Sequence, residues 1–147
     1  MPKTGSKTVL SRTHDMTIRV YYEDTDAAGI VYYANYLKFA ERARTEMLRD
    51  FGADHRALGE ELGVTFVVRR CLIDYHRPAK LDDLLEIRTH VANIGGARLD
   101  LLQQVRCGGD LLVSLSVRLA LLNDVLKPVR LPSVLIAALG SQYEVGN

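Results

Sequence analysis

The chain has 147 residues, of which 48% are hydrophobic and 25% charged, and its formal net charge at neutral pH is +1. This length suits one domain with a sizeable core, and the near-zero charge, without a dense Lys/Arg run, argues against a nucleic-acid partner. No apolar run approaches the roughly 20 residues that a membrane-spanning helix needs, and residues 1–16 lack the apolar segment of a signal peptide.

Residues 1–16 are therefore predicted to be a flexible N-terminal tail, followed by a single domain over residues 17–140 and a C-terminal tail over residues 141–147. The domain opens with β-branched and aromatic residues at 18–22, which favour a strand. A polar turn follows, and helical spacing then runs from residue 35 to residue 51. Asn35 is predicted to be the N-cap of this helix, and Gly52 suits the left-handed position after its end.

The second half of the chain changes from helical to strand periodicity. A short helix is expected at 54–62, and strands are expected at 64–77, 84–94, 97–107 and 111–121, before a last helix at 133–139. Clean alternation predicts an antiparallel sheet with one face covered, and only the helix at 35–51 is long enough to cover it. The predicted class is α+β. The long edge strands invite pairing with a second copy.

The two cysteines, Cys71 and Cys107, lie in apolar strand-like surroundings without the ligand spacing of a metal site. We therefore expect reduced cysteines that pack in the sheet, no bound metal, and a cytoplasmic protein.

The turn before the long helix carries the residues with the most chemistry. Asp26 precedes a helix N-terminus, where free backbone N–H groups and the helix dipole favour negative charge. A carboxylate facing such donors could catalyse acyl chemistry. The residue pattern alone favours a simpler interpretation, a polar loop whose acidic residues only cap the helix and keep the loop solvated, because acidic residues near helix starts are common for capping.

The run RVYYEDTDAAGIVYYANY at residues 19–36 closely resembles the signature of hotdog-fold acyl-CoA thioesterases. It is most similar to the YbgC group, which is associated with the Tol–Pal system, and to the related 4-hydroxybenzoyl-CoA thioesterases. Residues 41–48, 66–69 and 78–83 are also similar to the YbgC group. The likeness covers roughly residues 17–125.

The resemblance implies a hotdog fold, in which a five-stranded antiparallel sheet wraps around the long central helix. It also implies a dimer or a dimer of dimers, with active sites at the dimer interface. Asp26 matches the catalytic carboxylate of this family, and Tyr33 matches the residue whose backbone N–H binds the thioester carbonyl. The candidate substrate-binding residues are Tyr22, Gly29 and Val31 in the turn, with Arg69 and Arg98 as contacts for coenzyme A phosphates.

Two departures from the family pattern matter. Many YbgC-type proteins have a histidine where this chain has Tyr33, although the hydroxybenzoyl-CoA enzymes have tyrosine there. The basic cluster with which the hydroxybenzoyl-CoA enzymes meet the nucleotide phosphates is reduced here to Arg98, in the turn at residues 95–98. The second departure favours the YbgC group over a hydroxybenzoyl substrate.

The resulting prediction is an acyl-CoA thioesterase that needs no cofactor, since coenzyme A is part of its substrate. Asp26 would act either as a general base on water or as a nucleophile, and these two roles stay open. The alternative is a non-catalytic hotdog module that binds acyl-CoA or an acyl-carrier protein and associates with membrane-lipid enzymes. A hotdog dehydratase would require a catalytic histidine, which this turn lacks.

Overall fold

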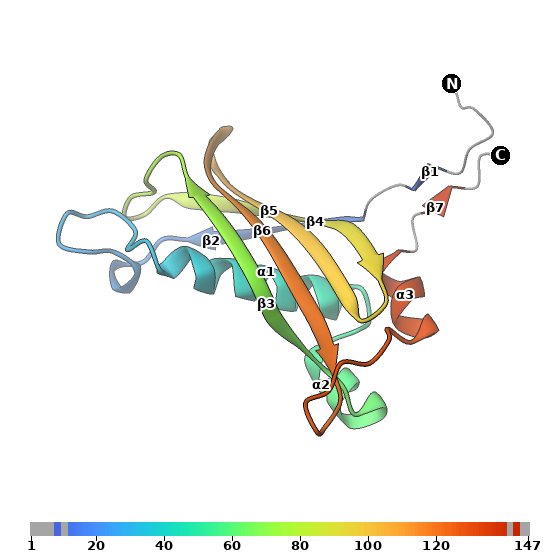
Figure 1. Ribbon diagram of the computed structural model, residues 1–147. Helices are drawn as coiled ribbons and strands as arrows, with labels where there is room; N and C mark the ends of the chain where they lie inside the picture. Colours follow the sequence, from blue (N-terminus) through green and yellow to red (C-terminus); the bar gives the residue numbers. More distant parts are fainter. Residues whose placement is uncertain (1–7, 10–11, 141–142, 145–147) are drawn as a thin grey trace.

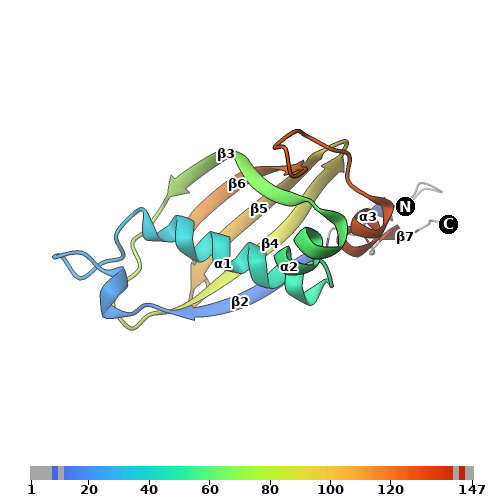
Figure 2. The ribbon, with the colours of Figure 1, turned by 90° about the horizontal axis from the view of Figure 1, so that it is seen from below.

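The computed structural model describes residues 8–9, 12–140 and 143–144. Its main sheet contains five antiparallel strands in the spatial order β2-β4-β5-β6-β3. These strands are β2 (Thr13–Arg19), β3 (Thr65–Tyr75), β4 (Leu84–Gly95), β5 (Arg98–Cys107) and β6 (Asp110–Leu122). The helix α1 (Asn35–Asp50) crosses the concave face of this sheet, as Figures 1 and 2 show. The expected α+β architecture, with one long helix on a five-stranded sheet, is confirmed.

Alternating burial explains why these segments form one covered sheet. In β4, Leu85, Ile87, Thr89 and Val91 are buried beneath α1, while Glu86 and Arg88 between them are exposed. The helix contributes a matching apolar stripe: Tyr36, Phe39, Ala40, Ala43, Met47 and Leu48 are all buried. It packs mainly against β2 and β4. The β3 side of the concave face is therefore left more open.

The smaller elements lie at one end of the sheet. They are α2 (His55–Ala57), the π-helical turn Leu58–Leu62, and α3 (Ser133–Leu139). The helix predicted at 54–62 thus divides into two short pieces. Asp54 caps the first, because its Oδ1 accepts a hydrogen bond from the N–H of Ala57 at 2.7 Å. Both Gly52 and Gly63 have positive φ angles, of 83° and 66°, as residues after helix ends often do. None of the described helices is both long and apolar enough to cross a membrane.

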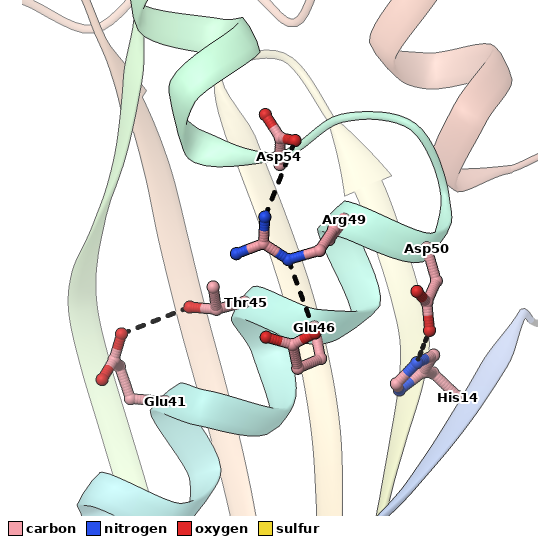
Figure 3. Close-up of polar contacts among 7 residues, drawn as sticks. All are labelled: His14, Glu41, Thr45, Glu46, Arg49, Asp50 and Asp54. Atoms are coloured by element: carbon pink, nitrogen blue, oxygen red, sulfur yellow. Dashed lines mark hydrogen bonds and ion pairs between the residues drawn. The ribbon is translucent and has the colours of Figure 1, made fainter.

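Polar contacts secure the C-terminal half of α1 to its surroundings (Figure 3). His14 Nε2 of β2 lies 2.6 Å from Asp50 Oδ2 at the last turn of the helix. The Nε of Arg49 lies 3.4 Å from the Oε1 of Glu46, and its Nη1 lies 4.0 Å from the Oδ2 of Asp54. Earlier in the helix, the hydroxyl of Thr45 donates to Glu41 at 3.2 Å. These contacts fix the end of α1 that lies away from the predicted site.

The first strand differs from its prediction. A strand was expected at 18–22, but β2 ends at Arg19, and Tyr22–Asp24 form a 3₁₀ turn. Residues 13–16 of the predicted tail belong to β2, while β1 (Thr8–Val9) pairs with β7 (Tyr143–Glu144). The rest of both predicted tails falls outside the described residues. The division into tails and domain stays a prediction.

Candidate active site

The segment that carries Asp26 forms a short hairpin over residues 25–31. Thr25 and Val31 are bridge partners, and the N–H of Asp26 donates to the carbonyl of Ile30 at 2.9 Å. The turn closes where the N–H of Gly29 donates to the carbonyl of Asp26 at 3.0 Å. Gly29 has a φ of 80°, which favours glycine at this corner. The hairpin extends beyond the start of α1, at the left of Figure 1.

The carboxylate of Asp26 lies on the surface of this hairpin. Its Oδ1 accepts a hydrogen bond from the N–H of Ala28 at 2.8 Å, an arrangement that orients the side chain from its own backbone. Its Oδ2 has no partner among the described residues. Asp26 is exposed, so one carboxylate oxygen is free to accept a proton or to attack a bound substrate.

A second turn, at residues 78–83, supports the hairpin through backbone hydrogen bonds. The N–H of Val31 donates to the carbonyl of Ala79 at 2.9 Å, and the N–H of Leu81 donates to the carbonyl of Gly29 at 3.3 Å. The N–H of Ala79 in turn donates to the hydroxyl of Tyr36, on the first turn of α1, at 3.0 Å. Tyr36 is buried, and this burial raises the pKa of its hydroxyl. It thus links the helix to the hairpin.

Asp24 has a structural role next to the site. It is buried, and its Oδ2 accepts from the N–H of Tyr21 at 2.8 Å while its Oδ1 accepts from the Nδ2 of Asn35 at 3.0 Å. Both oxygens are therefore engaged: Oδ2 closes the 3₁₀ turn on Tyr21, and Oδ1 ties this turn to Asn35, the first residue of α1. This contact also corrects the N-cap prediction. The N-cap is Ala34, without a side-chain cap, because Asn35 has entered the helix and turned toward Asp24.

The start of α1 consequently presents unused donors. No hydrogen bond formed within the described residues uses the backbone N–H of Tyr33, whose carbonyl accepts from the hydroxyl of Tyr75 at 3.1 Å. The positive end of the helix dipole adds to the field at this point. An oxygen that gains negative charge would be stabilised here.

A cavity of about 330 Å³ lies beside this helix start. Its lining consists of Ile30, Val31, Tyr33, Tyr36, Tyr75, His76, Arg77 and Pro78. The rings of Tyr33 and Tyr36 both meet the ring of Tyr75 edge to face, at centroid distances of 6.2 and 5.7 Å. Partial burial raises the pKa of the Tyr75 hydroxyl, so this group stays a protonated donor at neutral pH. The lining is mostly aromatic and aliphatic, with His76 and Arg77 as its basic members.

The predicted site residues do not all converge in one chain. Val31 and Tyr33 line this cavity, and Asp26 and Gly29 belong to the hairpin beside it. Tyr22 is 83% exposed on the 3₁₀ turn and is not part of the lining. The roles of these residues in catalysis and substrate binding stay predictions.

The two predicted arginines lie elsewhere on the sheet. Arg69 is the extra residue of a bulge in β3, between Val68 and Arg70. Arg98 begins β5 beside the β4–β5 turn, at the end of the sheet near α3, and pairs with Asp100 at 3.5 Å. In a single chain, Arg98 is therefore at the opposite end of the sheet from the Asp26 hairpin. Its substrate-binding role also stays a prediction.

Tyr36 and Tyr75 are the residues that sequence reasoning missed. The sequence analysis placed Tyr36 only within the expected helix at 35–51 and Tyr75 only within the expected strand at 64–77. The one available signal was the position of Tyr75 near the end of a strand, three residues before Pro78, where side chains often line a site.

Comparison with known proteins gives a consistent result. Residues 28–114 match the family model described as the thioesterase superfamily. The acyl-CoA thioester hydrolase YbgC of Shigella flexneri is 44% identical over 122 residues, covering 82% of this chain and 90% of that protein. The acyl-CoA thioesterase YbgC of Haemophilus influenzae is 42% identical over 131 residues, covering 88% and 96%. The crystal structure of a probable thioesterase from Bartonella henselae is 43% identical, with a TM-score of 0.79, and covers 82% of this chain and 100% of that one.

Proposed function

Because this chain belongs to the thioesterase superfamily, we propose that it hydrolyses the thioester of an acyl-CoA, giving a free acid and coenzyme A. The predicted family is confirmed, and the enzyme is a thioesterase. The choice of acyl-CoA as substrate and the roles of individual residues are our proposal. The observation that carries it is the uncapped start of α1, where the N–H of Tyr33 is free beside an apolar cavity and next to the Asp26 hairpin.

The proposed reaction uses this geometry in two ways. The thioester carbonyl would accept a hydrogen bond from the N–H of Tyr33, and its oxygen gains negative charge as the carbonyl carbon is attacked. A fixed donor of this kind lowers the barrier by about 3–4 kcal/mol in other enzymes. Since the contribution comes from the backbone, a tyrosine can stand where related proteins have histidine.

Asp26 would supply the second contribution. As a general base it takes a proton from water while the water oxygen bonds to the carbonyl carbon and the thiolate of coenzyme A leaves. As a nucleophile it instead forms a mixed anhydride, expels the thiolate, and is released when water hydrolyses the anhydride. Both routes consume one water and need no cofactor.

We further infer a homodimer formed through the free edge of β3. Val68, Leu72 and Tyr75 of this strand are 50%, 53% and 45% exposed. The opposite edge strand, β2, exposes Thr13, Asp15, Thr17 and Arg19 but no large apolar side chain, so it offers less apolar surface to a second copy. On the side of the sheet that faces α1, a groove of about 390 Å³ adjoins Val68. Its lining combines Leu37, Val68, Cys71 and Val117 with the charged residues Lys38, Glu41 and Arg44. A second chain would cover this edge and the groove, and it would close the open side of the candidate active site.

The test is thiol release from short aliphatic, long aliphatic and aromatic acyl-CoAs, and from an acyl-carrier-protein thioester. Asp26→Asn should lower turnover by about 10²–10⁴-fold while the unfolding midpoint stays the same, because the change is nearly isosteric. The matched control is Glu23→Gln, which neutralises an exposed carboxylate in the same loop and should keep full activity.

Release that persists in Asp26→Asn would contradict the assignment of the carboxylate. If folded wild type released no thiol from any substrate but was protected against heat by acyl-CoA, the non-catalytic binding module would replace this proposal. The cytoplasmic location, a further pairing into tetramers, and an association with membrane-lipid enzymes stay predictions from the sequence.

A further inference from the structure

The outer face of β3 carries an unusual row of side chains. Arg70, Leu72 and Asp74 follow one another at two-residue spacing on the convex face, opposite Arg118, Ser116 and Ser114 of β6. All three are exposed. Within the described part of the chain, the side chains of Arg70 and Asp74 form no hydrogen bond and no ion pair, while their backbones pair with β6. The free edge of the sheet thus presents a cation, an apolar residue and an anion in sequence.

The guanidinium of Arg70 has no ion-pair partner among the described residues, and Asp100, which lines the same cavity of about 270 Å³, is bonded to Arg118. The cross-strand neighbour of Arg70 is another cation, Arg118, and like charges directly opposite each other are destabilising. Arg118 is already engaged with Asp100, through hydrogen bonds of 2.9 and 3.4 Å. Asp74 faces the uncharged Ser114. Among the residues that the structure describes, the side chains of Arg70 and Asp74 therefore stay unpaired within one chain.

We propose, resting on the proposed dimeric thioesterase, that two β3 strands pair antiparallel about a two-fold axis at Leu72. Each Arg70 then lies directly opposite Asp74 of the partner subunit. A two-fold axis perpendicular to a continuous sheet keeps convex side chains on the convex face. Directly opposed side chains lie about 4.5–5.5 Å apart at Cβ, within reach of an Arg–Asp ion pair. Leu72 meets Leu72 of the partner subunit at the axis.

Neighbouring registers fail on charge. An axis at residue 70 opposes two arginines, and an axis at residue 74 opposes two aspartates. An axis at residue 71 places Arg70 against Leu72 of the partner subunit, and an axis at residue 73 places Leu72 against Asp74 of the partner subunit. Only the axis at residue 72 pairs both charges and both leucines. On the concave face it also sets Cys71 against Ile73 of the partner subunit, an apolar pair.

This register completes the candidate site with a residue from the second chain. The position opposite Tyr75, at the wall of the cavity, is that of the partner's Arg69. In its own chain Arg69 is exposed in the β3 bulge, and a bulge often redirects a side chain. A guanidinium at this place suits the phosphate groups of a coenzyme A thioester. The site would thus combine Asp26, Tyr33 and Tyr75 of one subunit with Arg69 of the partner subunit.

Charge reversal tests the register directly. Arg70→Asp and Asp74→Arg should each raise the dimer dissociation constant about tenfold or more, because two ion pairs become two repulsive pairs. The double variant Arg70→Asp/Asp74→Arg should return to within about threefold of wild type. Lys127→Asp, the same charge change in the loop after β6, serves as control. Sedimentation over a dilution series measures all five proteins, and failure of the double variant to recover would overturn the register.

Cysteine cross-linking gives an independent readout, because its central variant, Leu72→Cys, changes no charge. In a Cys71→Ala background, Leu72→Cys should form a disulfide-linked dimer on mild oxidation, since opposed antiparallel residues lie 4.5–5.5 Å apart at Cα. Arg70→Cys and Asp74→Cys should not, because four residues of offset separate the two copies by about 13 Å. A cross-link in either control, without one at residue 72, would contradict the proposal.

Mixing variants tests the shared site. Arg69→Ala should raise the KM for acyl-CoA but not for an acyl-pantetheine, which lacks the nucleotide phosphates. Mixed dimers of Asp26→Asn and Arg69→Ala contain one fully wild-type site if Arg69 acts across the interface, and none if it acts within its own chain. Recovered acyl-CoA turnover is therefore expected. An unchanged KM in Arg69→Ala, or no recovery on mixing, would overturn the shared site, whereas thiol release by wild type tests the proposed function separately.

Discussion

The hydroxyl of Tyr75 donates a hydrogen bond to the backbone carbonyl oxygen of Tyr33 at 3.1 Å, joining the end of β3 to the residue that precedes the N-cap of α1. The two residues are 42 positions apart, so only the folded sheet brings them together. Because the bonded carbonyl belongs to Tyr33 itself, the contact restrains the backbone that also presents the Tyr33 N–H. Tyr75 is thus placed to position the proposed donor without taking part in the chemistry.

Tyr75→Phe should therefore lower kcat by about 3–10-fold, the equivalent of one hydrogen bond of roughly 1 kcal/mol, and leave KM nearly unchanged. Steady-state kinetics with the best acyl-CoA measures both constants. Tyr32→Phe serves as the control, because it removes the hydroxyl of an exposed tyrosine next to Tyr33. Its kcat and KM should match those of wild type. Equal kcat values for Tyr75→Phe and wild type would show that the backbone keeps its position without this bond.

Asp24 and Asp26 are expected to separate stability from activity. Asp24 is buried and accepts two hydrogen bonds, from the N–H of Tyr21 and the side chain of Asn35. In Asp24→Asn an amide nitrogen must face one of these donors, so unfolding free energy should fall by about 1–3 kcal/mol. Urea denaturation measures this loss, with Glu23→Gln as the neighbouring control. An unchanged midpoint would show that the hairpin does not depend on Asp24.

Side-chain periodicity predicted most of the fold because burial in this sheet alternates cleanly. The strands at 84–94, 97–107 and 111–121 begin and end within one residue of β4, β5 and β6, and the helix at 133–139 matches α3. The start of β2 was missed because Thr13, Asp15 and Thr17 face solvent and only His14, Met16 and Ile18 face inward. A strand whose exposed face is polar, and whose inward face includes a histidine, lacks the apolar alternation that distinguishes a strand from a flexible terminal tail in sequence.

The candidate site was predictable only where it is local in sequence. The Asp26 turn and the following helix start could be recognised in one stretch of residues. The prediction of Asn35 as N-cap was wrong, because its side chain donates a hydrogen bond to Asp24. This contact joins residues eleven positions apart, and capping propensity does not report it. Tyr36 and Tyr75 were missed for the same reason, since their roles depend on where residues 78–83 and the end of β3 pack.

Gln103 is expected to be the most sensitive polar residue in the core. It is buried in β5, where its Nε2 donates to the Ala40 carbonyl and to the Thr89 hydroxyl, both at 3.0 Å, and its Oε1 accepts from Arg44 at 3.0 Å. Burial lowers the pKa of Arg44, which shows that this guanidinium has already lost much of its hydration.

Gln103→Leu should therefore reduce the free energy of unfolding by about 2–4 kcal/mol. The change leaves the Thr89 hydroxyl without its hydrogen-bond donor and removes the acceptor of the half-buried Arg44 guanidinium. Chemical denaturation measures the loss. Gln104→Leu makes the same change at the next residue, on the convex face, and should alter stability by less than about 1 kcal/mol. Similar losses in the two variants would mean that the cost comes from the strand and not from the buried network.

Asp15 and Arg88 should give stability a defined pH dependence on the convex face. Arg88 donates two hydrogen bonds to Asp15, at 2.8 and 3.1 Å, and these bonds hold the pKa of the Asp15 carboxyl below its usual range, against a smaller effect of burial. Because the folded pKa is depressed, the stabilisation is present above the unfolded value of about 3.9 and is lost as pH falls through the folded value. Arg88→Gln should raise the pKa of Asp15 in an NMR titration. The Arg88→Gln variant should also have a lower free energy of unfolding than wild type at neutral pH. This difference should disappear in acid and shrink in high salt. A difference that persists in acid would assign the effect to packing of the aliphatic part of the Arg88 side chain.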